Sequence, residues 1–211
     1  DAYNDYGFGY CFLLSIVDRG VDKPDDYSRE AVQDILDTIP AGTDSGAAGN
    51  TKPNVIFVQL ESFFDVNTLA GVTYSEEPLP NLKRLAAMYP SGQFEVPVIG
   101  AGTVNSEFEV LTGMRVKDFG AAEYPYKSIL SEKTCETIAY DLLASGYRTH
   151  AIHNHQGSFY ARNEVYTHLG FQDYTSIEYF RRPEYNKREW AKDSILTDEI
   201  LSLITATEER D

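Results

Sequence analysis

The sequence contains little cysteine, since Cys11 and Cys135 are the only two in 211 residues. Two cysteines cannot supply the set of disulfides that stabilises a small secreted domain, so the fold must depend on a hydrophobic core. Hydrophobic residues make up 42% of the chain and aromatic residues 13%. This is enough apolar material for one sizeable core.

Basic residues are also scarce, with 18 Lys and Arg against 33 Asp and Glu and a formal net charge of -15. Such a charge repels nucleic acid and other polyanions, which excludes nucleic-acid binding as the expected function. An anionic substrate would need local compensation by a metal ion or by a few well-placed Arg and His side chains.

Long apolar runs are missing as well, because no segment approaches the roughly 18 apolar residues that span a bilayer. Residues 6–17 (YGFGYCFLLSIV) are nevertheless aromatic and uncharged, and Asp18 and Arg19 follow them. This segment is either a buried helix or strand, or a membrane-proximal piece of a longer anchor. The residues alone leave both readings open.

Turn-forming residues divide the chain into two parts. Ser28 follows the segment DKPDDY and can cap a helix over residues 29–38. Residues 40–53 (PAGTDSGAAGNTKP) lack periodicity and predict a flexible connection. We therefore expect a membrane-proximal segment, a short helix and a linker over residues 1–53, and a catalytic domain over residues 54–211.

Strands and helices are expected to alternate in the second part. Apolar runs predict strands, and amphipathic segments that end at glycine predict helices. The expected strands are 54–60, 93–98 and 147–153, and the expected helices are 82–88, 103–112, 131–144 and 194–205. This order predicts an α/β fold with a largely parallel sheet, in which ligands bind beyond the carboxyl ends of the strands.

Glu61 comes at the carboxyl end of the expected strand 54–60. A carboxylate at the partly buried rim of a sheet needs a partner, and carboxylate oxygen is a suitable ligand for Mg²⁺, Mn²⁺ or Zn²⁺. A lone glutamate there can equally pair with an arginine or cap a helix.

Thr103 follows the small loop VIGAG and opens the segment TVNSEFEVLTG. At a helix N-terminus, backbone N–H groups and the helix dipole stabilise an alkoxide or a phosphoryl oxygen. Thr103, Asn105 or Ser106 can instead serve simply as an N-cap, because Ser106 and Glu109 also fit a capping box.

The stretch HNHQGSFYAR follows the expected strand 147–153 and places His153, His155 and Arg162 where an α/β sheet presents ligand-binding groups. The histidines can bind a metal, donate to phosphate or do neither, because no acidic side chain accompanies them. Arg162 can bind phosphate with two hydrogen bonds, or can be a solvated surface charge.

Taken together, these motifs resemble the lipoteichoic acid synthase and phosphoglycerol transferase family of the alkaline phosphatase superfamily. NVIFVQLESF is similar to the first strand of that family, whose terminal glutamate binds the catalytic metal, and this role falls on Glu61. GAGTVNSEFEVLTG is similar to its nucleophile segment, which makes Thr103 the metal-binding nucleophile. HNHQGSFYARNEVYTHLGF is similar to its glycerol-phosphate pocket, with contacts from His153, Tyr160 and Arg162.

The resemblance implies an alkaline phosphatase-like sandwich and one divalent ion, Mn²⁺ or Mg²⁺, with Zn²⁺ also possible. It implies transfer of glycerol phosphate from a phosphatidylglycerol-like lipid through a phosphothreonine intermediate. The expected partners are an anionic glycerophospholipid or a glycerol-phosphate polymer. The expected location is the cell membrane, with an N-terminal anchor and an extracytoplasmic catalytic domain.

The chain departs from the family pattern in three respects. Tyr160 stands where the synthases have Trp, which leaves the substrate open. Neither Cys11 nor Cys135 lies in the C/S-x-P-x-R signature of sulfatases proper, which disfavours a sulfate ester. The family's remaining Asp and His ligands would come after residue 211, so this chain is expected to be the N-terminal part of the catalytic domain and could be inactive alone. A phosphatase or sulfuric ester hydrolase, or an inactive glycerol-phosphate-binding domain, remain alternatives.

Overall fold

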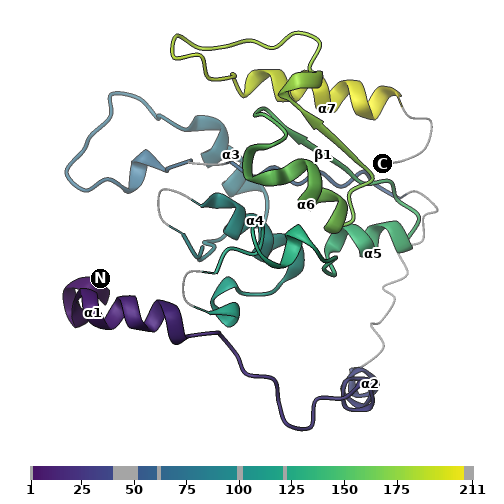
Figure 1. Ribbon diagram of the computed structural model, residues 1–211. Coiled ribbons are helices and arrows are strands. Elements are labelled where there is room, and N and C mark those ends of the chain that lie inside the picture. Colours follow the sequence, from purple (N-terminus) through teal and green to yellow (C-terminus); the bar gives the residue numbers. More distant parts are fainter. Residues whose placement is uncertain (1, 40–51, 61–62, 99–101, 121–122, 207–211) are drawn as a thin grey trace.

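A computed structural model describes residues 2–39, 52–60, 63–98, 102–120 and 123–206 (Figure 1). Helices and short strands share this part of the chain. The α-helices are α1 (Ala2–Val17), α2 (Arg29–Thr38), α3 (Pro80–Met88), α4 (Thr103–Thr112), α5 (Ile138–Ala144), α6 (Arg162–His168) and α7 (Ser194–Ala206). The strands are β1 (His150–His153) and β2 (Asp173–Ser176). Short 3₁₀ helices occur at Val66–Thr68, Val116–Phe119, Ile129–Ser131, Phe159–Ala161 and Ile177–Tyr179.

The two strands form a parallel pair, with His150 opposite Asp173 and His153 opposite Ser176. Helix α6 connects them and lies on one face of the pair, while α7 lies on the other (Figure 1). Parallel strands joined by a helix and covered on both faces are typical of α/β proteins. The predicted α/β class is therefore confirmed, with a parallel sheet of two strands in the described part of the chain.

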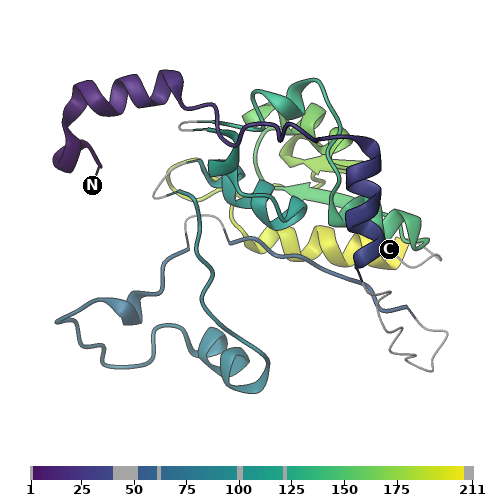
Figure 2. The ribbon, with the colours of Figure 1, turned by 90° about the horizontal axis from the view of Figure 1, so that it is seen from below.

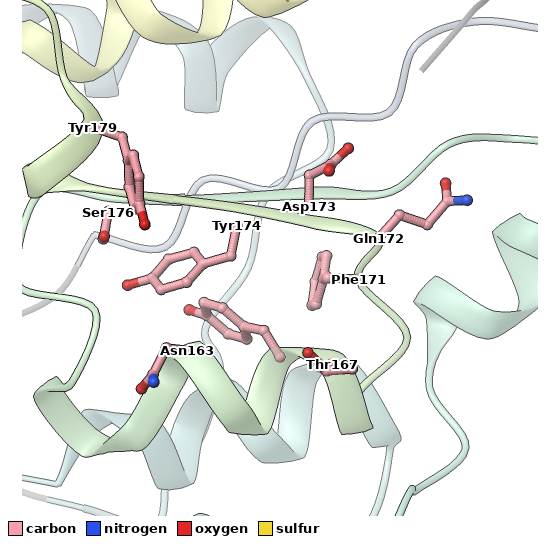
Figure 3. A pocket seen from close by; sticks show the side chains of 9 residues that line it. Asn163, Thr167, Phe171, Gln172, Asp173, Tyr174, Ser176 and Tyr179 are labelled. Carbon is pink, nitrogen blue, oxygen red and sulfur yellow. The ribbon is translucent and has the colours of Figure 1, made fainter.

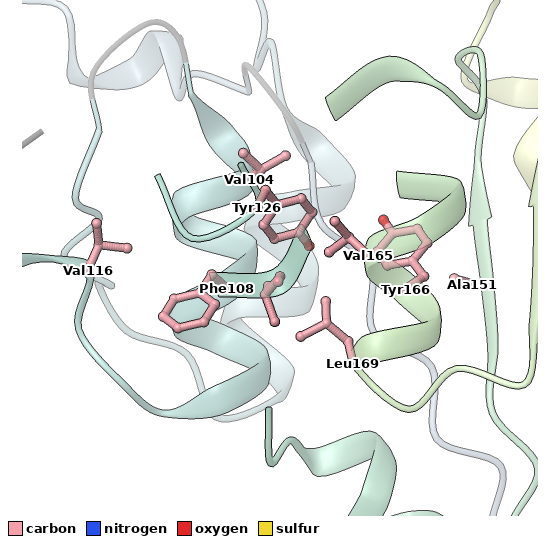
Figure 4. Packing of buried hydrophobic residues seen from close by; sticks show 9 residues of the cluster. Val104, Phe108, Val116, Tyr126, Ala151, Val165, Tyr166 and Leu169 are labelled. Atoms are coloured by element: carbon pink, nitrogen blue, oxygen red, sulfur yellow. The ribbon is translucent and has the colours of Figure 1, made fainter. Parts of the chain in front are cut away.

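The core lies between α4 and α6. Val104 of α4 lies on the side facing Val165 of α6, Tyr126 lies between the two helices, and the Phe108 ring points to the other side of α4, toward Val116 (Figure 4). All five side chains are buried. Burying a side chain of this size contributes roughly 1.5–3 kcal/mol. The core thus holds the start of α4, where Thr103 lies, against α6.

Several helices match their sequence-based predictions. Helix α2 spans the predicted residues, and the Ser28 hydroxyl accepts a hydrogen bond from the Ala31 N–H at 3.0 Å. Helix α4 also spans the predicted residues and ends at Gly113, whose φ of 71° is left-handed. Helices α3 and α7 extend the predictions by one or two residues. Local capping signals were therefore sufficient to place these helices.

The two strands expected at residues 54–60 and 93–98 are wrong. Both segments are described, neither is a strand, and residues 54–60 are exposed along their length. A buried parallel strand needs hydrogen-bonded neighbours as well as apolar side chains. In the described part of the chain, the pairing of β1 and β2 does not extend to either segment.

Two other predicted elements are shorter than expected. The helix predicted over residues 131–144 begins at Ile138, because the Thr137 hydroxyl caps it by accepting hydrogen bonds from the N–H groups of Ala139 and Tyr140. The strand predicted over residues 147–153 begins at His150, where the pairing with β2 starts. The carboxyl end at His153 is as predicted.

Replacing Thr137 with valine is expected to lower the free energy of unfolding by about 2 kcal/mol. The Thr137 hydroxyl is buried, and besides capping α5 it donates to the Leu169 carbonyl oxygen at 2.6 Å. Valine keeps the shape but leaves those groups without their partner. Urea-induced unfolding measures the change. Thr134→Val, at an exposed position nearby, is the control and should unfold like wild type.

Helix α1 extends away from the α/β core (Figures 1 and 2). Its aromatic side chains Tyr6, Phe8 and Tyr10 are exposed, so the reading of residues 6–17 as a buried element is wrong. Gly7, at φ 79°, interrupts the helix. Among the described residues, no helix combines the length and the hydropathy needed to cross a membrane.

Candidate active site

Thr103 is the first residue of α4, as predicted. Gly102 precedes it with a left-handed φ of 81° and serves as the N-cap. A Cβ on Gly102 would approach the Tyr124 hydroxyl oxygen to 2.6 Å, so both the backbone angle and the close neighbour require glycine. This turn places Thr103 at the helix N-terminus, where N–H groups and the helix dipole favour negative charge.

Arg162 is the first residue of α6 and is 1% exposed. Its Nη2 donates to Glu107 Oε2 at 3.0 Å, and its Nε donates to the Tyr166 hydroxyl at 3.1 Å. Its Nη1 is buried and has no hydrogen-bond partner among the described residues. The reading of Arg162 as a solvated surface charge is therefore wrong.

Tyr160 connects Arg162 with the turn before Thr103. Its ring stacks on Tyr124 at a centroid distance of 6.0 Å, and Tyr124 is the residue that lies against Gly102. The Arg162 guanidinium lies 5.4 Å from the centre of the Tyr160 ring. Tyr160 and Ala161 both have positive φ, 56° and 54°, a conformation that costs of order 1–3 kcal/mol per residue. Such strain is common at binding sites.

His153 ends β1, at the carboxyl edge of the sheet. Its Nδ1 accepts a hydrogen bond from the His155 N–H at 3.1 Å, which in a neutral ring places the proton on Nε2. The His155 ring stacks on Phe159 at 4.2 Å, and Phe159 lies 4.5 Å from Tyr160. A row of aromatic rings therefore runs from His153 to Tyr160.

The loop between β1 and α6 is also held by the 3₁₀ helix Ile177–Tyr179, which follows β2. The Gly157 N–H donates to both carboxylate oxygens of Glu178, at 3.0 and 3.2 Å. Hydrogen bonding by Ser176, and secondarily by backbone groups, lowers the pKa of the Glu178 carboxyl. Glu178 is thus charged at neutral pH and holds the loop that carries the aromatic row.

Glu61, the predicted metal ligand, lies outside the described residues. In the described part of the chain, no cluster of three or more His, Cys, Asp or Glu side chains could hold a metal ion. The Thr103 hydroxyl is an oxygen donor of the kind that Mg²⁺ and Mn²⁺ accept, so the predicted ligand that lies in the described part of the chain fits the expected ion chemically.

Glu107 and Tyr126 are buried site residues that sequence reasoning did not identify. The Tyr126 hydroxyl donates to Glu107 Oε1 at 2.6 Å, on the opposite side of the carboxylate from Arg162. Burial raises the pKa of Tyr126 well above its usual value, and the Glu107 charge raises it further. Burial, the largest single effect, lowers the pKa of Arg162, but Glu107, Tyr166 and Tyr126 together raise it by more, so the net shift is upward. The cluster is therefore a charged pair with a neutral tyrosine.

A separate cavity of about 280 Å³ lies between α6 and β2 (Figure 3). Asn163, Tyr166 and Thr167 of α6 face Tyr174 and Ser176 of β2 across it. The predicted residues Thr103, His153, Tyr160 and Arg162 do not line it. Burial, more than any other effect, raises the pKa of Tyr174 to about 12, so its hydroxyl faces the cavity in neutral form.

Known proteins resemble this chain in sequence and fold. The sequence matches the sulfatase family over residues 53–211. It is 33% identical over 207 residues to the "Putative cyclic beta-1,2-glucan modification protein" of Rhizobium meliloti (strain 1021), covering 95% of this chain and 30% of that protein. It is 27% identical over 153 residues to the capsular polysaccharide biosynthesis protein RkpI of the same organism, covering 71% of this chain and 28% of that one.

Among solved structures, the Streptococcus pyogenes phosphoglycerol transferase GacH in complex with sn-glycerol-1-phosphate aligns with a TM-score of 0.53 and 26% identity. The alignment covers 60% of this chain and 34% of GacH. This chain therefore spans about a third of the length of the proteins that it matches. The family match covers most of the chain and agrees with the α/β fold. The chain belongs to the sulfatase family, within the alkaline phosphatase superfamily.

Proposed function

We propose that the whole protein transfers glycerol phosphate from a phosphatidylglycerol-like lipid to an acceptor hydroxyl, with Thr103 as the nucleophile. One observation carries this proposal. Glu107 lies one helical turn after Thr103, on the same face of α4, and pairs with the buried Arg162 at 3.0 Å. Glu107 therefore links the Arg162 guanidinium to the helix face that carries the Thr103 hydroxyl, and an attack on a phosphodiester needs these two groups near each other.

The relatives support both halves of this reaction. GacH is a phosphoglycerol transferase, and its structure contains sn-glycerol-1-phosphate. The two Rhizobium meliloti relatives are named for glucan modification and for capsular polysaccharide biosynthesis. We therefore place the acceptor hydroxyl on a cell-envelope carbohydrate.

Two displacements make up the proposed chemistry. In the first, Thr103 Oγ1 bonds to phosphorus, the bond from phosphorus to the diacylglycerol oxygen breaks, and the proton that Thr103 loses balances the one that diacylglycerol gains. In the second, the acceptor oxygen bonds to phosphorus, the bond from phosphorus to Thr103 Oγ1 breaks, and the proton that the acceptor loses balances the one that Thr103 regains. Arg162 binds phosphate oxygens with charge-assisted hydrogen bonds, and His153 and Tyr160 contact the glycerol.

A divalent ion, Mn²⁺ or Mg²⁺ with Zn²⁺ as an alternative, would stabilise negative charge on the Thr103 oxygen when bound. Glu61 and Thr103 are its proposed ligands in this chain. Residues 1–53 are proposed as a membrane-proximal segment, helix and linker that precede the catalytic domain, so that the domain acts outside the cytoplasm near its lipid substrate.

The test is to incubate the whole protein with Mn²⁺ and phosphatidylglycerol vesicles, and to measure diacylglycerol release and intact protein mass. A glycerophosphoryl adduct is expected, and addition of cyclic β-1,2-glucan should remove it and yield glucan that carries glycerol phosphate. Removal of the metal with EDTA should stop both steps.

Aryl phosphate and aryl sulfate esters serve as the comparison substrates. Rapid hydrolysis of either, with no adduct from phosphatidylglycerol, would contradict the transferase and favour an ester hydrolase on the same fold. Binding of glycerol phosphate without any turnover would favour an inactive binding domain.

A further inference from the structure

Four buried side chains form a connected polar cluster between α4 and α6. Tyr126 and Arg162 donate to the two different oxygens of Glu107, at 2.6 and 3.0 Å, and Arg162 also donates to Tyr166 at 3.1 Å. Arg162 is 1% exposed and Tyr126 is fully buried. The cluster therefore fixes the guanidinium from two sides.

Stability alone is a weak reason for such a cluster. Moving two charges out of water costs several kcal/mol per ion, and well-packed apolar side chains are often as stable as a buried ion pair. Here the arrangement is also incomplete, because Arg162 Nη1 has no hydrogen-bond partner among the described residues. A buried cationic donor without a partner is costly unless an anion completes it in the working protein.

The cluster lies near Thr103, the proposed nucleophile. Glu107 and Thr103 are separated by one helical turn, which places their Cβ atoms about 5–6 Å apart. On its other side, Arg162 lies against the Tyr160 ring, and Tyr160 stacks on Tyr124 beside Gly102. Arg162 thus contacts Glu107 on the helix that begins at Thr103, and through Tyr160 and Tyr124 it is linked to Gly102, the residue before Thr103.

We infer that Glu107 is a positioning residue, which with Tyr126 holds Arg162 so that Nη1 receives a phosphate oxygen of the substrate at Thr103. This inference rests on the proposed function for the identity of the phosphate ester. Glu107 does not contact the substrate itself. It occupies the Nη2 side of the guanidinium, Tyr166 occupies Nε, and these two contacts set the direction of the remaining donor.

The experiment measures the affinity of the whole protein for sn-glycerol-1-phosphate by calorimetry, together with thermal unfolding. Glu107→Gln keeps the size of the side chain but removes its charge, and it is expected to weaken binding about tenfold or more. Tyr126→Phe leaves both charges in place and removes one hydrogen bond to Glu107, so it should weaken binding by about two- to fivefold. Asp118→Asn is the matched control, because it breaks an exposed ion pair with Arg115 and should leave affinity unchanged.

A purely structural role would lower the unfolding temperature of both variants while their folded molecules bound with wild-type affinity, and that result would overturn the inference. Absence of binding by the wild type would overturn it too, because no phosphate site would then exist. If Glu107→Gln is unfolded, the affinity of Tyr126→Phe for sn-glycerol-1-phosphate tests the inference. Weakened binding in the variants without any diacylglycerol release by the wild type would uphold the positioning role and refute the transferase. Normal transfer by the wild type, with unchanged affinity in the variants, would uphold the transferase and refute the positioning role.

Discussion

Replacing Thr103 with alanine is expected to reduce release of diacylglycerol from phosphatidylglycerol by about 10³-fold or more, and to abolish the glycerophosphoryl adduct. The reason is that Thr103 supplies the only oxygen that becomes bonded to phosphorus in the first proposed displacement. The fold should be little affected, because Thr103 is partly exposed at the first position of α4 and Gly102, not Thr103, is the N-cap. Rates over a range of lipid concentrations and intact mass together measure the effect.

Two variants make this result specific. Thr103→Ser keeps a hydroxyl at the same position and should retain an adduct and measurable turnover. Thr112→Ala removes a threonine hydroxyl at the other end of the same helix, where it donates to the Phe108 carbonyl oxygen at 2.7 Å, and should leave the rate unchanged. Wild-type turnover by Thr103→Ala would refute the assignment of the nucleophile.

Local signals in the sequence accounted for the parts of the site that depend on neighbouring residues. Ser28 and the glycine at position 113 mark helix ends through their own side chain or backbone angle, so α2 and α4 were placed to the residue. The motif around Gly102 likewise placed Thr103 at a helix N-terminus. Such features need no knowledge of distant segments, because capping and left-handed turns are decided within a few residues.

Contacts between distant segments were not predictable in this way. Glu107 and Arg162 are 55 positions apart in the sequence, and nothing near either residue indicates that the other is its partner. The glutamate looks like an ordinary polar residue in an amphipathic helix. The same limit explains the wrong strand at residues 54–60, where an apolar β-branched run indicates a strand but cannot supply the neighbour with which a strand must pair.

The core that supports the site can be tested separately from its chemistry. Phe108→Ala is expected to lower the free energy of unfolding by about 3–5 kcal/mol, since the ring is fully buried and its removal leaves a cavity in the core beside α4. It also removes an edge-to-face contact with Phe119 at 5.7 Å. A loss of this size is a large fraction of the roughly 5–15 kcal/mol that stabilises a typical domain. The urea concentration at the unfolding midpoint measures it.

Val110→Ala is the matched control on the same helix, because Val110 is 45% exposed and alanine has the higher helix propensity. Its midpoint should stay close to wild type. Since Phe108 lies one residue after Glu107 and belongs to the same buried cluster as Val104, loss of its ring should also loosen α4, which carries the Glu107 partner of Arg162. Phe108→Ala should therefore bind glycerol phosphate more weakly even under conditions where it is fully folded. A midpoint equal to that of Val110→Ala would show that the packing of Phe108 in the core beside α4 does not determine the stability of the fold.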